Sequence, residues 1–427
     1  MFATARRIAT GTLHARHINA QWVHLLDFLG MNIDYASCRG TTLRTADGRR
    51  IPDFLSGYCV YNIGHNHPDV LGELIEELHH DAPTMLQSHV PVLAGELAGE
   101  LCRRAGGGLE KAYFTSSGSE GIETAIKFAR AHTRRPGLIS CQGAFHGLTM
   151  GALSIMGNPW WSEGFGPLLA HVHPVPFGDL GALEEQLSRR QAAAFVVEPI
   201  QAEAGIRVPA PSYLAAAQDL CRQHGTLMVL DEVQTGFHRC GPFLAAHSYG
   251  LEPDMVVLAK AMSGGLVPVG ALLMRDEIHR SVYSSLSRAF IQASTFGENR
   301  LAMRAGLRSR LAGFAMIEEI RGAGLLCGIA FRPPTSRRLK FMYHAFQRIH
   351  PGMFGQMLVS DLFRRENILT QTCGNNFMVL KAAPPLTTHE DHLQAFVDAL
   401  ERTVRRIHAG TGFWRQGLGM IPRALRI

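Results

Sequence analysis

Short runs of apolar residues recur through the middle of the chain and predict buried β-strands. Three of them lie within residues 193–197, 227–230 and 254–259. Continuous aliphatic runs of this length are typical of strands buried on both faces of a parallel sheet, because a half-exposed strand alternates apolar and polar positions. Glu198, Asp231 and Lys260 directly follow these runs. Open α/β sheets build their sites at the carboxyl ends of strands, so we expect Asp231 and Lys260 to share a site.

The stretch around residue 118 predicts a strand, a serine-rich turn and a helix. Residues 112–115 are strand-like, and residues 121–131 place apolar side chains at helical spacing. Between them, Ser117 and Glu120 have the spacing of an N-terminal capping box. The same turn could bind a phosphate, because a helix N-terminus offers free N–H groups and glycine lets an anion approach closely. The two interpretations are compatible, and the spacing alone favours the cap.

Shorter elements are predicted towards both ends of the chain. Residues 36–55 indicate a small antiparallel unit around an Asp47-Gly48 turn, a strong hairpin signal. Beyond residue 300, the pattern alternates again over 318–331, over a helix at 352–365 and over a strand-like run at 377–386. No internal repeat or low-complexity segment interrupts the chain.

Composition restricts the class of protein. The 427 residues are enough for two or three domains, and 46% of them are apolar. No apolar run approaches the roughly 18 residues of a membrane span. Eight scattered cysteines without paired spacing favour a reduced, cytoplasmic protein without disulfides. The first 26 residues lack acids but are poor in serine, so we expect an N-terminal arm rather than a transit peptide.

Charge and histidine spacing argue against two further classes of site. The formal net charge is +6, and the basic doublets are spread along the chain, so no nucleic-acid-binding stripe is expected. His65 and His67 have a spacing that two metal ligands could share. No third ligand lies nearby in the sequence, and Asn-His-Pro favours a turn, so no metal site is expected.

Two motifs carry a resemblance to a known family. One is Leu-Asp-Glu-Val-Gln-Thr-Gly-Phe at 230–237, and the other is Pro-Asp-Met-Val-Val-Leu-Ala-Lys-Ala-Met-Ser-Gly-Gly at 253–265. A lone Asp or Lys at a strand end is more often structural than catalytic. Together, however, the motifs resemble those of the class III aminotransferases, pyridoxal-phosphate enzymes that include ornithine, acetylornithine and putrescine aminotransferases. The resemblance extends from about residue 17 to residue 397.

This resemblance implies a fold and a division into domains. The expected fold is the α/β fold of type I pyridoxal-phosphate transferases, with a large domain built on a mostly parallel seven-stranded sheet. Residues 61–300 would form this cofactor-binding domain. A smaller α+β domain would be built from both chain ends, residues 1–60 and 301–427.

The resemblance also assigns roles around the cofactor. Lys260 would be the Schiff-base nucleophile and, once released, the base that moves the substrate proton. Asp231 would keep the pyridine nitrogen protonated, Gln234 would hold the 3-oxygen, Phe145 would stack on the ring and Glu198 would lie behind it near Asp231. The full implied set of cofactor contacts is Ser117, Gly118, Ser119, Phe145, His146, Glu198, Asp231, Gln234, Lys260, Ser294 and Thr295.

Partners and substrate contacts follow from the same resemblance. Thr295 would reach the cofactor phosphate of the neighbouring subunit, which implies a homodimer. Glu203 would be a mobile acid that occupies or vacates a carboxylate-binding position. The implied substrate contacts are Tyr58, Tyr61, Glu203 and Lys381. The expected substrates are a small amine donor and a keto-acid acceptor.

The sequence departs from the family pattern at several positions. Glu298 replaces a usual glycine, Arg300 replaces a usual proline, and Lys381 replaces an arginine that clamps a substrate carboxylate. Lysine lacks the planar fork of arginine, so we expect looser carboxylate recognition. The segment from Thr295 to Arg321 is also shorter than usual and suggests that most of one helix is missing.

The function expected from the sequence is a ping-pong aminotransferase. Its donor would be an ω-amino acid, a diamine or an ornithine-like amino acid, and its acceptor a keto acid such as 2-oxoglutarate or pyruvate. A decarboxylase or aminomutase of the same fold uses the same residues and stays open. A pyridoxal-phosphate-binding relic with impaired catalysis is a further alternative, motivated by Arg300 and the shortened segment.

Overall fold

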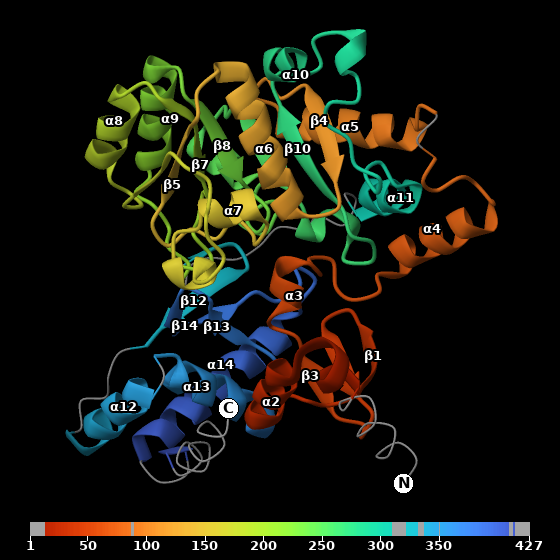
Figure 1. Ribbon diagram of the computed structural model, residues 1–427. Helices are drawn as coiled ribbons and strands as arrows, with labels where there is room; N and C mark the ends of the chain where they lie inside the picture. The colour runs from red at the N-terminus through yellow and green to blue at the C-terminus, as the bar shows by residue number, and fades with distance from the viewer. Residues whose placement is uncertain are drawn as a thin grey trace.

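A large mixed sheet forms the centre of the molecule (Figure 1). The computed structural model describes residues 13–86, 89–309, 322–331, 337–349, 351–409 and 413–414. Over these residues, six strands of the sheet share one direction, and β10 runs antiparallel between β4 and β9. In spatial order, the strands are β4 (Lys111–Thr115), β10 (Gly270–Met274), β9 (Met255–Leu258), β8 (Leu227–Asp231), β7 (Ala192–Val197), β5 (Gly137–Cys141) and β6 (Val172–Val175). The expected mostly parallel seven-stranded sheet is confirmed.

Helices cover both faces of this sheet and explain its apolar runs. Successive strand residues alternate between two buried clusters, so that Leu230 faces one layer of helices and Val229 the other. The first layer contains α5 (Val92–Ala105), α8 (Leu180–Ser188) and α9 (Tyr213–His224). The second contains α6 (Gly118–Thr133), α7 (Met150–Ser154) and α10 (Asp276–Val282). Because neither face meets water, both positions are apolar.

Two smaller antiparallel sheets lie on the other side of the molecule (Figure 1). The first confirms the predicted hairpin around Gly48 and contains β1 (Tyr35–Arg39), β2 (Thr42–Thr45) and β3 (Arg50–Pro52). The second has the order β11 (Gly322–Ala323), β12 (Leu326–Ala330), β14 (Asn376–Ala382) and β13 (Gln371–Cys373). Residues 318–321 of the predicted 318–331 element lie outside the described part of the chain.

One hydrophobic cluster joins the two ends of the chain. Phe28, Leu29 and Phe54 pack with side chains from residues 343–414. The helices of this region are α2 (Ala20–Leu29), α12 (Arg337–Ile349), α13 (Met353–Glu366) and α14 (Glu390–Ala409). The helix predicted over 352–365 is confirmed as α13. The cluster includes Leu380 and Ala382 of β14, so the helices of both chain ends pack against the four-stranded sheet.

The remaining elements connect these layers. They are α3 (Ser56–Cys59), α4 (Pro68–His79), α11 (Arg300–Ser309), the short helices η2 (Pro159–Ser162), η3 (Ala245–Tyr249), η4 (Lys260–Ser263) and η5 (Leu286–Arg288), and the π-helix η1 (Ala15–Asn19). The segment from Thr295 to Arg321 was expected to be shortened; its residues 310–321 lie outside the described residues. Within the described part of the chain, no helix is long and apolar enough to cross a membrane.

Candidate active site

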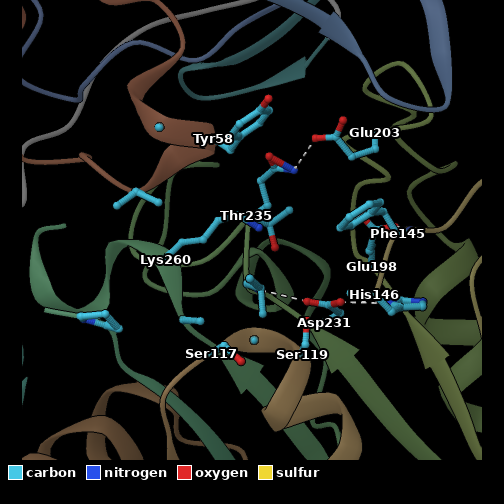
Figure 2. A pocket seen from close by; sticks show the side chains of 18 of the residues that line it. Tyr58, Ser117, Ser119, Phe145, His146, Glu198, Glu203, Asp231, Thr235 and Lys260 are labelled. Atoms are coloured by element: carbon cyan, nitrogen blue, oxygen red, sulfur yellow. Dashed lines mark hydrogen bonds and ion pairs between the residues drawn. The ribbon is translucent and has the colours of Figure 1, made fainter. Parts of the chain in front are cut away.

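A cavity of about 610 Å³ opens at the carboxyl ends of the central strands. Glu198 follows β7, Asp231 ends β8, and Lys260 comes two residues after β9, so the sheet itself brings these three side chains together. Figure 2 shows Ser117 and Ser119 at one end of the cavity and Tyr58 and Glu203 towards the other. Asp231 and Lys260, which the sequence predicts to share a site, line the same cavity.

Asp231 is a buried carboxylate with two partners. Its Oδ2 lies 2.8 Å from Nδ1 of His146, and its Oδ1 accepts the backbone N–H of Val233 at 3.1 Å. Burial lowers the pKa of His146, but the hydrogen bond and charge of Asp231 outweigh it and raise that pKa overall. The hydrogen bond with His146 therefore fixes the position of this carboxylate.

Glu198 lies beside this pair and is held differently. Its carboxylate accepts the backbone N–H of Phe145 at 3.0 Å, and its side chain is buried. Burial raises the pKa of Glu198 to about 8, and the neighbouring negative charge of Asp231 adds to the effect. Because this pKa lies above neutral pH, Glu198 is mainly protonated at pH 7.

Lys260 sits on a strained turn. Its φ of 43° is unusual for a residue with a side chain, and Gly264 and Gly265 follow with φ of 66° and 87°. A Cβ at Gly265 would lie 2.4 Å from the ring of Tyr61, so glycine is required where the two segments meet. This packing holds the turn that aims Lys260 into the cavity (Figure 2).

The N-terminus of α6 forms the end of the cavity near Ser117. Its side chain accepts the backbone N–H of Glu120 at 3.2 Å, as the capping box predicts. The carboxylate of Glu120 returns to the N–H of Ser116 at 2.8 Å rather than to that of Ser117. The cap leaves N–H groups available for an anion, because the first N–H groups of a helix have no intrahelical partner.

Glu203 and Lys381 form a buried ion pair at the opposite end. Lys381 is fully buried, and its Nζ lies 5.1 Å from the ring centre of Tyr58. Glu203 also accepts Nε2 of Gln234 at 3.3 Å and the N–H of Gly374 at 2.8 Å. Burial alone would raise the pKa of Glu203, but the charge of Lys381 outweighs it and lowers that pKa. Burial would likewise lower the pKa of Lys381, and Glu203 raises it overall.

Comparison with known proteins identifies the family. The family model of class-III aminotransferases matches residues 29–311. The putrescine aminotransferase of Pectobacterium atrosepticum is 33% identical over 390 residues, which cover 83% of this chain and 78% of that protein. The chain belongs to the class-III aminotransferases. They are pyridoxal-phosphate enzymes, and pyridoxal phosphate is the cofactor of this chain.

Two further relatives support this membership. The aminotransferase PigE of a Serratia species is 33% identical over 439 residues, which cover 90% of this class-III aminotransferase and 52% of PigE. The chain thus spans about half the length of that relative. The ornithine aminotransferase of Toxoplasma gondii, solved with partial occupancy of PLP at its active site, superposes with a TM-score of 0.77. It is 25% identical, with 88% of this chain and 91% of that chain covered.

The cavity of this class-III aminotransferase fits its cofactor. A buried carboxylate, Asp231, is available for a cationic ring nitrogen, and Phe145 supplies an aromatic face. The residues around the N-terminus of α6 are closely packed, because a Cβ at Gly147 would come within 2.2 Å of Oγ of Ser119. A Cβ at Gly118 would likewise meet Val233 at 2.8 Å, so glycine is required where the start of α6 packs against Val233. Among the described residues, no group of His, Cys, Asp or Glu side chains is placed to hold a metal ion.

Most of the predicted site residues meet in this cavity, and four do not line it. Ser117, Gly118, Ser119, Phe145, His146, Glu198, Glu203, Asp231, Gln234, Lys260 and Tyr58 all line its wall. Tyr61 was expected to contact the substrate but stacks on His65 at 3.9 Å, behind the lysine turn. Lys381 lies behind Glu203 and Tyr58. Ser294 lines a second cavity together with Phe290 and Glu298. Thr295 lies outside the first cavity as well.

Sequence reasoning missed one wall of the cavity. Trp161 lines it, and its ring meets Phe145 edge-on at 5.2 Å. Nε1 of Trp161 donates to Oδ1 of Asn375 at 2.8 Å. The Trp160-Trp161 pair was the available signal, but nothing local connects it with a turn more than 200 residues later.

Proposed function

We propose that this chain transfers an amino group from an ω-amino acid, a diamine or an ornithine-like donor to a keto acid such as 2-oxoglutarate or pyruvate, by a ping-pong mechanism. The observation that carries the proposal is the convergence of Lys260, Asp231 and the N-terminus of α6 on one cavity. An amine, an acid and an anion site on separate elements are what a phosphorylated aldehyde cofactor requires.

The residues would divide the work by position. When bound, pyridoxal phosphate supplies an aldehyde that reacts with amines and a cationic ring that withdraws electrons. Lys260 Nζ would attach the cofactor and, after release by the donor, move a proton from the donor carbon. Asp231 would hold the proton on the ring nitrogen, and its hydrogen bond with His146 would keep the carboxylate in position.

The end of the cavity away from the phosphate would handle the acceptor. Glu203 would turn away from Lys381 to expose that cation to the acceptor carboxylate. Two contacts of Glu203, with Gln234 and with the N–H of Gly374, would break in that motion. When the acceptor carboxylate leaves, Glu203 and Lys381 would form their ion pair again, so the movement of Glu203 would be reversible. Acceptor binding would therefore be weaker than in enzymes with a free arginine at this position.

Borohydride reduction and peptide mapping test the proposal. We expect the purified protein to show visible cofactor absorbance and, after reduction, a pyridoxyl adduct on Lys260. Lys127→Met is the control variant, because Lys127 is exposed and does not line the cavity. The adduct on Lys260 should be retained in this variant. A chain that binds no pyridoxal phosphate when it is supplied would contradict the function. Product analysis with each donor then separates transamination from decarboxylation.

We also propose that the working unit is a homodimer in which Thr295 reaches the phosphate site of the partner. Support comes from exposed apolar side chains near Thr295, since Leu286, Phe290 and Phe296 are 93%, 84% and 61% exposed. We also propose a division into a large domain over residues 61–300 and a small domain from both chain ends. The hydrophobic cluster that joins the two chain ends is consistent with this division. A reducing, cytoplasmic location is consistent with the eight unpaired cysteines.

A further inference from the structure

A left-handed turn leads into the cavity wall at Tyr58. The residues of α3, Ser56–Cys59, have successive φ values of 53°, 57°, 61° and 68°. This conformation crowds the Cβ of an L-residue, so it is usual only at single residues such as glycine, and Gly57 is the only glycine of the four. The turn places Tyr58 in the wall of the cavity (Figure 2). Strained backbone of this kind persists where surrounding contacts over-determine it, and it clusters at functional sites.

A buried acid caps this turn from outside the cavity. Oδ1 of Asp53 accepts the backbone N–H groups of Leu55 and Ser56, both at 2.8 Å. Its Oδ2 lies 2.7 Å from Nε2 of His65, and both side chains are buried. The backbone N–H of Asp53 donates to the carbonyl of Thr41 at 2.9 Å, so the acid itself is held firmly. The Asp53–His65 pair thus fixes the turn and orients the histidine ring.

The ring of Tyr61 connects this pair with the turn after Lys260. Its centre lies 3.9 Å from that of the His65 ring. A Cβ at Gly57 would come within 2.9 Å of Cε2 of the tyrosine ring, and a Cβ at Gly265 within 2.4 Å of Cδ1. The two edges of the ring therefore face two glycines, one in the left-handed turn and one in the lysine turn. Both backbones approach the ring so closely that a side chain at either position would require a shift.

The position of Lys260 depends on such a constraint. A residue with a side chain keeps a φ of 43° only where its surroundings hold it. Tyr61 supplies a contact to the same turn five residues later, at Gly265, and does so without lining the cavity. A displacement of about 1 Å at a reacting group can cost about 10²-fold in rate, so a contact that fixes this turn also affects the chemistry.

We propose that Tyr61 is a positioning residue for Lys260 and that the Asp53–His65 pair holds its ring in place. The role rests on the proposed function, because it assumes that Lys260 attaches the cofactor. In that step, Nζ of Lys260 forms a bond to the aldehyde carbon and water leaves, so no oxidant or reductant is needed. Tyr61 takes no part in the bond changes and sets where Nζ lies.

Capture of pyridoxal phosphate by the cofactor-free protein tests the position of Lys260. Visible absorbance follows the rate of capture, and borohydride reduction with peptide mapping assigns it to the lysine. Binding of deoxypyridoxine phosphate, which has a methyl group in place of the aldehyde, is measured in parallel by equilibrium dialysis. This analogue needs the ring and phosphate sites but no bond to Lys260. A misplaced amine slows capture and leaves binding of the analogue unchanged, whereas a general loosening of the cavity weakens both.

Variants of Tyr61 and His65 test the ring contact. Tyr61→Leu removes the ring, and His65→Gln keeps a donor for Asp53 but loses the ring on which Tyr61 stacks. Each should slow capture at least fivefold, since a shift of about 1 Å can cost up to about 10²-fold. The affinity for deoxypyridoxine phosphate should stay within about twofold, because the N-terminus of α6 is unchanged. The combined variant should be no slower than the slower single one, as expected if His65 acts through Tyr61.

Two further variants show whether the ring alone matters. Tyr61→Phe keeps the ring and should retain at least half of the wild-type rate of capture. His67→Gln is the control histidine two residues later and should behave as the wild type, because His67 is partly exposed and does not line the cavity.

The cap is tested through the peptide bond after Tyr58. Asp53→Ala removes the acceptor for the N–H groups of Leu55 and Ser56, so chymotrypsin should cleave after Tyr58 about tenfold faster in the cofactor-free protein. Asp53→Asn keeps an acceptor oxygen and should be cleaved at close to the wild-type rate. Mass spectrometry of the fragments measures both rates. Equal rates in Asp53→Ala and the wild type would show that the acid does not hold the turn.

The outcomes separate this role from the proposed function. Slowing of capture by less than fivefold in Tyr61→Leu or His65→Gln would overturn the positioning role and leave the function standing. An equal loss of analogue binding would overturn it as well, because the contact would then support the whole cavity rather than the lysine. A wild-type protein that captures no pyridoxal phosphate would overturn the function itself.

Discussion

The three acids of the cavity are held in three different ways. Asp231 has a histidine and a backbone N–H, Glu203 has a lysine, and Glu198 has one backbone N–H. These partners set the charge of each group, because a buried carboxylate stays ionised only where a cation or several donors compensate it. Lys381 outweighs burial and lowers the pKa of Glu203, whereas burial raises the pKa of Glu198 to about 8.

Replacing Asp231 by asparagine tests the partner of the ring nitrogen. Removing one member of a buried charge pair costs roughly 3–5 kcal/mol. If most of this cost falls on the transition state, kcat drops about 10²–10⁴-fold at 1.36 kcal/mol per decade. Phosphate binding at α6 persists, so cofactor absorbance should fall far less than turnover. Steady-state kinetics and absorbance of the same preparation check this, and near-normal turnover would show that Asp231 does not hold the ring.

The raised pKa of Glu198 predicts how the stability of the cofactor-free protein depends on pH. Burial raises the pKa of Glu198 from the ordinary value of 4.5 to about 8. The folded chain therefore holds a proton that the unfolded chain releases, and the stability that this proton contributes is present below pH 4.5 and lost as the pH rises through 8. Glu198→Gln removes the titration, so its thermal midpoint should fall less than that of the wild type between pH 5.5 and 9. Parallel declines in both proteins would contradict this assignment.

At the scale of elements, α4 and α11 are joined through a buried acid. Glu77 on α4 is 4% exposed and pairs with Arg300 and, at 3.0 Å, with Arg304 on α11. Burial raises the pKa of Glu77, but the two arginines outweigh it and lower that pKa overall. The backbone N–H of Arg300 also donates to the carbonyl of Thr84 at 3.1 Å. The arginine that departs from the family pattern thus anchors the segment that follows Thr295.

Neutralising this acid should loosen that segment. Glu77→Gln leaves Arg300 and Arg304 without the acid that they share, and only the more distant Glu73 remains near Arg304. We expect a loss of about 2–3 kcal/mol, below the range for fully buried pairs because both arginines are partly exposed. Differential scanning calorimetry measures the loss. Glu73→Gln is the matched control one turn earlier, since Glu73 lies 3.9 Å from Arg304 and is partly exposed. Equal effects of the two changes would show that the buried position does not matter.

The sequence predicts elements better than it predicts how they meet. Apolar runs, the Ser117 cap and the turn at Gly48 correctly indicate local structure, because each depends on residues a few positions apart. Tyr61 and Trp161 show the limit. Side-chain direction at Tyr61 is set by its packing on Gly265, and the contact of Trp161 with Asn375 joins two loops distant in sequence. Periodicity contains no information on either contact.

At the scale of the whole molecule, the cavity is assembled from both sheets. Lys260, Asp231 and Glu198 come from the strand ends of the seven-stranded sheet, while Gln371, Thr372 and Gly374 come from β13 and the turn after it in the four-stranded one. The acid and amine groups and this part of the cavity wall therefore belong to different parts of the chain. Relative movement of the two sheets would change the wall before it changed the acid and the amine.

Mixing two inactive variants tests whether a second copy completes the site. Lys260→Ala and Thr295→Ala chains are co-expressed, so that mixed dimers contain one site with an intact lysine and an intact threonine from the other chain. We expect activity to recover to about a quarter of the wild type, because half of the dimers are mixed and half of their sites are whole. Lys260→Ala mixed with Asp231→Asn is the control and should not recover, since both residues serve the same chain's site. Absence of recovery in the first mixture would place Thr295 outside the partner's site.

The cluster that joins both chain ends has a consequence for synthesis on the ribosome. Phe28 and Trp414 pack in one core, yet the ribosome must add 386 residues after Phe28 before Trp414 is in place. At about 5–20 residues per second, the apolar face of α2 waits roughly 20–80 s for its partner. The strands from β4 to β10 can meanwhile pair, because all of them emerge earlier. The nascent protein therefore carries a nearly complete large sheet and an uncovered leading helix, which is a binding target for chaperones until the last helix emerges.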